Sequence, residues 1–208
     1  MVLGLDTCLA SCSVAVCDGE RVLASAREVM ARGHQERLAP MAQTVMTEAG
    51  LSFDKLDRIA VTVGPGSFTG LRVGIAFAKG LAAALDLPTV GVGSLEALAA
   101  EADGLVFAVV DARRGQVYLQ GFEDGRALMA PDALTAETAA ARIAELSIGR
   151  PLTLVGSGAP LVEALTPGAT VILAEGADAR HVARLAAGRE PKPLKPLYLR
   201  APDAKLPA

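Results

Sequence analysis

The chain has 208 residues, a formal net charge of -3 and 51% hydrophobic residues, which suits one or two compact domains with a sizeable core. The negative net charge offers no basic footprint for phosphates, unless folding gathers an arginine patch. Aromatic residues make up only 3%, which is too few to predict a platform for stacked bases. No run reaches the roughly 18 apolar residues of a membrane helix, and no leader pattern precedes the first strand. We therefore expect a cytoplasmic protein that does not enter a membrane.

The first half of the chain alternates strand and helix patterns. Strands are expected at residues 2–5, 12–16, 21–26, 59–63 and 88–92, and the Asp18-Gly19 pair is a hairpin turn. Helices are expected at residues 35–49, from the glycine-rich turn after residue 63 to about Leu85, and at 94–102 with Ser94 as the cap. The first of these helices should begin near Glu36 or Arg37, because Pro40 is tolerated only near a first turn.

The three cysteines, Cys8, Cys12 and Cys17, all fall within the first strands and their turn. Their spacing matches no metal motif, and no feature of the sequence would activate a thiol. We expect small buried side chains in a reducing compartment.

The second half repeats the order of the first. Strands are expected at residues 105–110, 117–122, 126–129, 152–155 and 171–173, and helices at 136–146, 160–165 and 179–187. In both halves the first strand ends at an aspartate, Asp6 or Asp111, and an Asp-Gly turn follows 12 or 13 residues later. This order predicts an internal duplication. Residues 191–208 are predicted to form an extended tail, partly docked through Leu197, Tyr198 and Leu199.

A glycine-rich turn runs from Gly64 to Gly74 between a strand and a helix. The backbone N–H groups of such a turn can face a phosphate. It is not a Walker A loop, because no Lys-Ser/Thr pair follows the last glycine. The alternative is a tight turn in which Ser67 or Thr69 caps the helix.

The helix after this turn has very little polar surface. Wound at about 100° per residue, it places Arg72 and Lys79 on one narrow stripe and apolar residues or glycine in nearly every other direction. Such a helix is either central in the fold or covered by another chain. Gly70, Gly74 and Ala78 would admit a close neighbour, so we interpret the helix, together with the apolar stripe of 35–49, as a partner surface. Close packing inside the monomer is the alternative.

The two strand-end aspartates also fit a nucleotide site. Hairpins that follow such aspartates can hold phosphates, and a Gly-Ser-Gly loop can lie behind an adenosine. The candidate residues are Asp6, Thr7, Asp111, Arg113, Gly156 and Gly158. The alternative is that the aspartates cap turns.

His34 is a lone histidine at the start of a predicted helix. A metal site there would want a second histidine about four residues on, but that position is Leu38, and His181 lies on another predicted helix. We expect no metal site and a structural role for His34.

Several motifs together resemble the TsaB (YeaZ) family. They are Leu3-Gly-Leu-Asp-Thr7, Gly33-His-Gln-Glu36, Leu38-Ala-Pro40, the block over residues 61–81, Val110-Asp-Ala-Arg-Arg-Gly-Gln-Val-Tyr118 and Pro196-Leu-Tyr-Leu-Arg200. The likeness spans the whole chain. It implies an α/β protein with an actin-like duplicated fold (the ASKHA, ribonuclease H-like class) of two βββαβα-type halves. The halves would cover residues 1–103 and 104–190, and the tail over 191–208 would dock back on the fold.

The resemblance also implies a function without catalysis. The family is the partner of TsaD, a glycoprotease-like (M22) catalytic subunit, and with the ATPase TsaE it supports formation of N6-threonylcarbamoyladenosine at position 37 of tRNA. TsaD holds a metal through two histidines on its first helix, and this chain matches only one of them, His34. The implied partners are a TsaD-like subunit, a TsaE-like ATPase and, for the chain alone, a second copy; tRNA would be met only indirectly. No tightly bound cofactor is implied, although ATP or ADP at the partner boundary fits the family.

The same resemblance assigns the partner surface to the two helices of the first half. The implied partner-binding residues are His34, Leu38, Met41, Val45, Phe68, Leu71, Arg72, Ile75 and Phe77, some of which must instead face the core. A small-molecule kinase or ATPase of the same fold is the alternative, resting on the aspartates and the Gly-Ser-Gly loop. A metallopeptidase is a further alternative that would need a metal.

Overall fold

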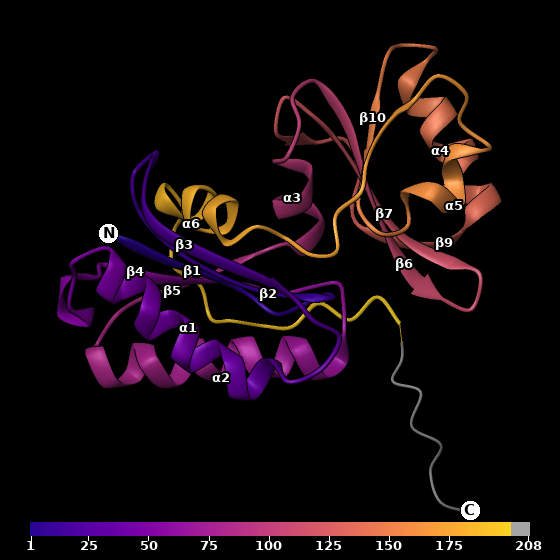
Figure 1. Ribbon diagram of the computed structural model, residues 1–208. Coiled ribbons are helices and arrows are strands. Elements are labelled where there is room, and N and C mark those ends of the chain that lie inside the picture. The colour runs from indigo at the N-terminus through magenta and orange to yellow at the C-terminus, as the bar shows by residue number, and fades with distance from the viewer. Residues whose placement is uncertain (201–208) are drawn as a thin grey trace, which may run out of the picture.

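The computed structural model describes residues 1–200 and contains two sheets (Figure 1). The first sheet consists of β1 (Val2–Asp6), β2 (Ser11–Asp18), β3 (Arg21–Val29), β4 (Arg58–Thr62) and β5 (Thr89–Val92), in the order β3-β2-β1-β4-β5. The second consists of β6 (Leu105–Arg113), β7 (Gln116–Glu123), β8 (Arg126–Ala127), β9 (Asp132–Thr135), β10 (Thr153–Val155) and β11 (Thr170–Ile172), in the order β11-β10-β6-β7-β8 with β9 also on β7.

The two sheets share one topology. In each, an antiparallel hairpin (β1–β2 or β6–β7) is followed by two strands parallel to its first strand (β4 and β5, or β10 and β11). The predicted duplication is therefore confirmed. The strand β9 was not predicted; it pairs with β7 beside the very short β8.

Helices cover both faces of the first sheet. The helices are α1 (His34–Glu48), α2 (Phe68–Leu85), α3 (Ser94–Ala99), α4 (Ala136–Ser147), α5 (Ala159–Glu163) and α6 (Ala179–Ala187), with a short 3-10 turn at Phe53–Lys55. Figure 1 shows α1 and α2 side by side under this sheet and α6 above it. The apolar stripe of α1 fills the space against β2, as its 3.6-residue period predicts.

The helix α6 crosses back to the other half. By sequence it falls within the predicted second half, 104–190, yet it packs on β1, β2 and β4 of the first sheet. Gly4 makes this possible, because a Cβ there would lie 2.3 Å from the carbonyl oxygen of Ala179. Conversely, α3 belongs by sequence to the first half but packs against β6 and β7 of the second sheet. One continuous hydrophobic cluster consequently joins the two halves.

Two local predictions were wrong in detail. The helix α1 begins at His34, so Pro40 lies inside it, on its exposed side, rather than in the first turn. Ser94 does not cap α3; Gly93 holds the cap position, and the Ser94 hydroxyl donates to the carbonyl oxygen of Pro65 at 2.5 Å. A buried acceptor close by has drawn the hydroxyl away from the helix end.

The helix α2 is long and apolar enough to cross a membrane by length and composition. In this fold its inner residues lie on the first sheet, and Leu71 and Ala78 are fully buried. The helix is therefore one layer of the core, with a second side that faces outward.

The C-terminal segment runs back along the first half as far as residue 200. Leu194 is 4% exposed, and the N–H of Leu197 donates to the carbonyl oxygen of Val63 at 2.7 Å. The docking predicted for this segment is thus present up to Arg200. The rest of the predicted tail, 201–208, lies outside the described residues.

Candidate functional site

The glycine-rich turn holds α2 tightly on the end of β1. The Ser67 hydroxyl accepts from the N–H of Gly70 at 3.3 Å, which is one of the two caps predicted. A Cβ on Gly70 would lie 2.0 Å from the carbonyl oxygen of Thr7, and one on Gly74 would lie 2.5 Å from the Thr7 hydroxyl oxygen. These glycines serve packing within the chain. The interpretation that they admit a helix of a second protein was wrong, and so was a partner contact for Ala78, which is fully buried.

The outward side of α2 is nearly devoid of polar groups. Its exposed residues are Phe68, Thr69, Arg72, Ala76, Lys79, Gly80, Ala83 and Ala84. Only three of these are polar, and the half-buried residues that flank them are Val73, Phe77, Leu81 and Leu85. We call these twelve residues the α2 outer face. Its composition is that of a helix covered on two sides.

The predicted partner-binding residues divide between this face and the core. Phe68 and Arg72 are exposed on the α2 outer face, and Phe77 is half-buried beside them. The remaining apolar members, each less than 9% exposed, point inward: Leu38, Met41, Val45, Leu71 and Ile75. Their assignment to a partner is corrected, because burying them against the first sheet is what anchors α1 and α2.

The exposed side of α1 has a different character. Its exposed residues are Gln35, Glu36, Arg37, Ala39, Pro40, Gln43, Thr44, Thr47 and Glu48. Seven of the nine are polar, which is the ordinary composition of a helix facing water.

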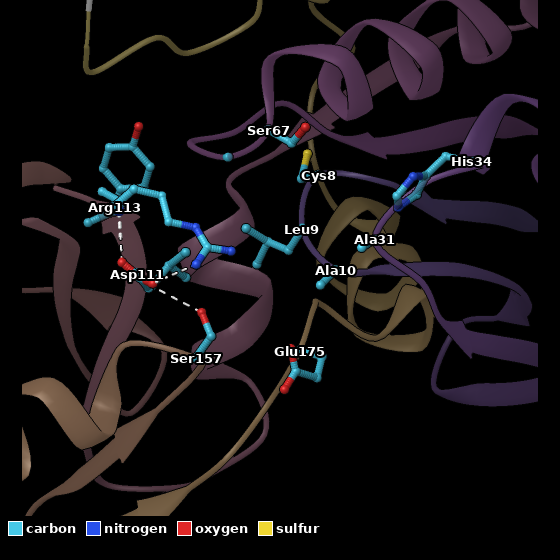
Figure 2. A pocket seen from close by; sticks show the side chains of 14 residues that line it. Cys8, Leu9, Ala10, Ala31, His34, Ser67, Asp111, Arg113, Ser157 and Glu175 are labelled. Atoms are coloured by element: carbon cyan, nitrogen blue, oxygen red, sulfur yellow. Dashed lines mark hydrogen bonds and ion pairs between the residues drawn. The ribbon is translucent and has the colours of Figure 1, made fainter.

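A cleft of about 510 Å³ lies between the two halves. Figure 2 shows Leu9 and Ala10 on the side of the first half and Asp111, Arg113 and Ser157 on the opposite side. Other residues that line it are Cys8, Ala31, His34, Gly66, Ser67, Val110, Ala112, Tyr118 and Glu175. Of the predicted nucleotide-site residues, Asp111 and Arg113 are in this lining and the other four are not.

Asp111 is tied to its own hairpin. Its Oδ1 accepts from the backbone N–H of Arg113 at 2.7 Å, and its Oδ2 lies 3.3 Å from the Arg113 guanidinium. Its backbone N–H donates to the hydroxyl of Ser157 at 3.3 Å, a bond drawn in Figure 2. The carboxylate thus performs the turn-capping role that the sequence left open, while the arginine faces the cleft.

Asp6 and Thr7 lie beneath the surface. Asp6 is fully buried, and its Oδ1 accepts from the Thr62 hydroxyl at 2.6 Å and from the Cys8 N–H at 3.2 Å. Burial raises the pKa of Asp6 to about 6, against the lowering effect of these hydrogen bonds and of the Arg27 charge. The Thr7 hydroxyl donates to the carbonyl oxygen of Gly70 at 2.7 Å. Thr7 thereby holds the end of β1 under α2, whereas Asp6 lies against the segment before α6, where a Cβ on Gly176 would be 3.3 Å from its Oδ2.

The Gly-Ser-Gly loop is packed against β6. A Cβ on Gly156 would lie 2.4 Å from the carbonyl oxygen of Val109, and one on Gly158 would lie 2.8 Å from the N–H nitrogen of Asp111. These glycines bring the loop close to the strand and leave Ser157 to reach the cleft.

Cys8 and His34 also line the cleft, and Cys12 is buried nearby in β2. Burial raises the pKa of Cys12 to about 12 and that of Cys8 well above its ordinary value, so neither is a ready nucleophile. The Nε2 atom of His34 is buried without a hydrogen-bond partner. Over residues 1–200 no group of three His, Cys, Asp or Glu side chains is placed to hold a metal ion.

Sequence reasoning missed part of the lining. Leu9, Ala10 and Glu175 meet there because the N–H of Ala10 donates to the carbonyl oxygen of Glu175 at 2.8 Å, across the two halves. No local sequence pattern predicts a contact between segments so distant in sequence.

Comparisons with known proteins agree with this architecture. A family model described as tRNA N6-adenosine threonylcarbamoyltransferase, TsaD, matches residues 23–164. The tRNA threonylcarbamoyladenosine biosynthesis protein TsaB of Escherichia coli is 41% identical over 122 residues, which cover 56% of this chain and 52% of that protein. The chain thus matches about half the length of this relative.

Solved structures extend the likeness to most of the chain. YeaZ from Pseudomonas aeruginosa is 32% identical, covers 89% of both chains and has a TM-score of 0.80. The ROK hexokinase from Thermus thermophilus, at 14% identity and a TM-score of 0.52 over 89% of this chain and 96% of that chain, shows the fold alone. The actin-like duplicated fold is therefore confirmed, and the chain belongs to the TsaB (YeaZ) family.

Proposed function

We propose that this chain is a non-catalytic partner subunit in the biosynthesis of tRNA threonylcarbamoyladenosine, and that its α2 outer face binds a TsaD-like catalytic subunit. The name of the E. coli relative supports the pathway. The observation that carries the partner role is the α2 outer face itself, in which nine exposed or half-buried residues are apolar or glycine and three are polar.

An apolar helix face of this kind is costly in water. Covering it with a second apolar helix removes that surface from water at about 25 cal/mol per Å². Ala76, Gly80, Ala83 and Ala84 have small side chains, so a partner helix can approach closely along the middle of the face. Phe68 at its start and Leu81 and Leu85 near its end supply larger apolar contacts.

The state of the two strand-end aspartates and of Cys8 supports a role without catalysis. Asp6 is closed off beneath the surface, Asp111 is held by its own hairpin, and the thiol of Cys8 has a raised pKa. None of these groups is placed as an activated nucleophile or base. Catalysis in the proposed complex belongs to the partner.

We place the proposed ATP or ADP site in the cleft between the halves, at the partner boundary. Arg113 would face the phosphates of the nucleotide, and this chain alone would not bind the nucleotide tightly. A TsaE-like ATPase is the second proposed partner. The alternative, a small-molecule kinase, shares this cleft and predicts ATP turnover by the purified chain. Calorimetric titration of the chain with ATP separates the two, because a kinase must bind ATP without help.

The proposed complex is tested by mixing the chain with a TsaD-like subunit. Size-exclusion chromatography should show co-elution, and threonylcarbamoyladenosine formation on tRNA should require both proteins. Two proteins that elute separately, with modification unaffected by this chain, would overturn the proposal.

We propose further that the chain alone pairs with a second copy through the same face and acts in the cytoplasm. Sedimentation of the chain without its partner should show a dimer that dissociates when the TsaD-like subunit is added. A dimer that persists in the complex would place self-association elsewhere.

A further inference from the structure

A second pocket, of about 270 Å³, opens beside the cleft where three segments meet. The segments are the tip of the β6–β7 hairpin, the start of α2 and the C-terminal segment. We call it the Arg–Tyr pocket; its lining residues with aromatic or charged side chains are Phe68, Arg113, Arg114, Tyr118, Tyr198 and Arg200.

Aromatic side chains are concentrated in this pocket. The chain has only two tyrosines and five phenylalanines, and both tyrosines and one phenylalanine line it. The rings of Phe68 and Tyr198 have centroids 5.5 Å apart, and both residues are 41% exposed. The Arg72 guanidinium lies 3.7 Å from the centroid of the Phe68 ring. Exposed rings next to a stacked guanidinium form a surface on which a planar base can stack.

The charge of the pocket is opposite to that of the chain. Arg113, Arg114 and Arg200 line it, whereas the chain as a whole carries -3; the Asp111 carboxylate, 3.3 Å from the Arg113 guanidinium, is outside the lining. The sequence alone left open an arginine patch formed by folding, and this pocket is such a patch. Its charge favours phosphate groups.

Arg113 and Arg114 lie at the tip of the β6–β7 hairpin. Arg113 and Arg114 have φ values of 64° and 56°, and Gly115 follows at 72°. Arg114 and Gly115 are the two central residues of the β6–β7 hairpin turn, where positive φ is the ordinary geometry, and Arg113 adjoins the register shift before the turn. The Arg200 guanidinium donates to the carbonyl oxygen of Ala112 at 2.9 Å, which ties the C-terminal segment to the same hairpin.

We propose that the Arg–Tyr pocket binds single-stranded RNA, with one base against the exposed ring of Tyr198 and the neighbouring phosphates on the arginines. Rings plus cations, without a deep enclosed cavity, are the features of a site that holds one nucleotide of a continuing strand. The choice of RNA rests on the proposed function, which brings tRNA to the complex. The chain would then contact tRNA directly, in place of the indirect contact implied by the resemblance.

The test is fluorescence anisotropy of the full chain with a labelled single-stranded RNA that has the sequence of a tRNA anticodon loop. Tyr198→Leu should weaken binding about tenfold, whereas Tyr198→Phe keeps the ring and should bind nearly as well as the wild type. Arg114→Gln should make the negative slope of log K against log salt shallower by about 0.7, the value for one phosphate contact on a single strand. The matched control, Arg126→Gln, removes an exposed arginine outside the pocket. Its RNA affinity and salt slope should stay closer to the wild-type values than those of Arg114→Gln.

Two outcomes would overturn the proposal. One is equal RNA affinity for wild type and Tyr198→Leu, with melting temperatures showing both folded. The other is binding of ADP or pyrophosphate at the pocket, lost in Arg114→Gln, with no binding of the RNA; the pocket would then be a site for a free nucleotide.

A second measurement separates this proposal from the proposed function. In a tRNA modification assay with the catalytic subunit, Tyr198→Leu should raise KM for tRNA while kcat and co-elution with the partner stay unchanged. If the wild-type chain binds RNA but neither co-elutes nor supports modification, the partner role fails and the RNA site stands. If co-elution and modification are normal and KM does not change, the RNA site fails and the partner role stands.

Discussion

Helices α1 and α2 lie side by side on one face of the same sheet, yet their outer sides differ sharply. Seven of nine exposed residues on α1 are polar, against three of eight on α2. Inward, the two helices are alike, because each buries an apolar stripe in the same cluster. The difference is therefore confined to the side that faces away from the sheet. This difference is what the proposed function requires of α2, a helix covered first by this chain and then by a partner.

The strongest way to break this comparison is to place the same charge on both helices. Ala76→Arg, in the middle of the α2 outer face, should weaken binding of the catalytic subunit by at least about a hundredfold, because an unpaired charge is buried in an apolar interface. Thr44→Arg on α1 should leave binding unchanged. Isothermal calorimetry of both variants measures the difference; equal effects would mean that the interface covers both helices or neither.

The inner sides can be tested by stability. Leu38→Ala should lower the free energy of unfolding by about 3 kcal/mol, since Leu38 is 1% exposed in the core. Thr44→Ala, its exposed neighbour on α1, should change stability very little. Urea denaturation gives both values. A Leu38→Ala variant with wild-type stability but impaired partner binding would return Leu38 to the interface.

The stability of the chain should respond to pH through Asp6, which is buried at the end of β1. Its pKa is raised in the folded state from 3.8 to about 6, so the stability it contributes is present below about pH 4 and is lost as pH rises through about 6. Asp6→Asn removes this titration and should gain about 3 kcal/mol over wild type at pH 8, with the gain vanishing at pH 4. Denaturant melts at both pH values measure it. A gain that grows toward low pH would contradict the sign.

The two sides of α2 also differ at their glycines. Gly80→Ala faces open space and should stabilise the free chain by about 1 kcal/mol through helix propensity. Gly70→Ala should instead destabilise it, because the new Cβ would meet the Thr7 backbone. Thermal melts of the two variants rank them. A stabilising Gly70→Ala would show that α2 is less closely seated than the structure indicates.

The contrast between the helices was only partly visible in the sequence. Winding α2 predicted its scarcity of polar groups, since Arg72 and Lys79 stand out in any projection. The sequence did not say which apolar residues face inward, because Leu71 and Ile75 have the same character as Phe68 and Phe77. Only the position of the sheet decides that.

Long-range contacts limited the prediction elsewhere. The placement of α6 on the first sheet depends on Gly4 meeting Ala179, and the Arg–Tyr pocket depends on Arg200 reaching Ala112. The strand-end aspartates were found by their repeated position, but the burial of Asp6 depends on contacts with Thr62 of β4 and with Gly176, just before α6. An internal repeat in the sequence predicts the fold well, but it does not predict the environment of a single side chain.

The most direct test of the central claim is site-specific photo-crosslinking. A photoreactive amino acid placed at position 76 of α2, and in a matched variant at position 44 of α1, is irradiated in the presence of the TsaD-like subunit. A crosslink from position 76 and none from position 44 is the expected result. Crosslinking from position 44 alone, with position 76 silent, would contradict the assignment of the α2 outer face to the partner.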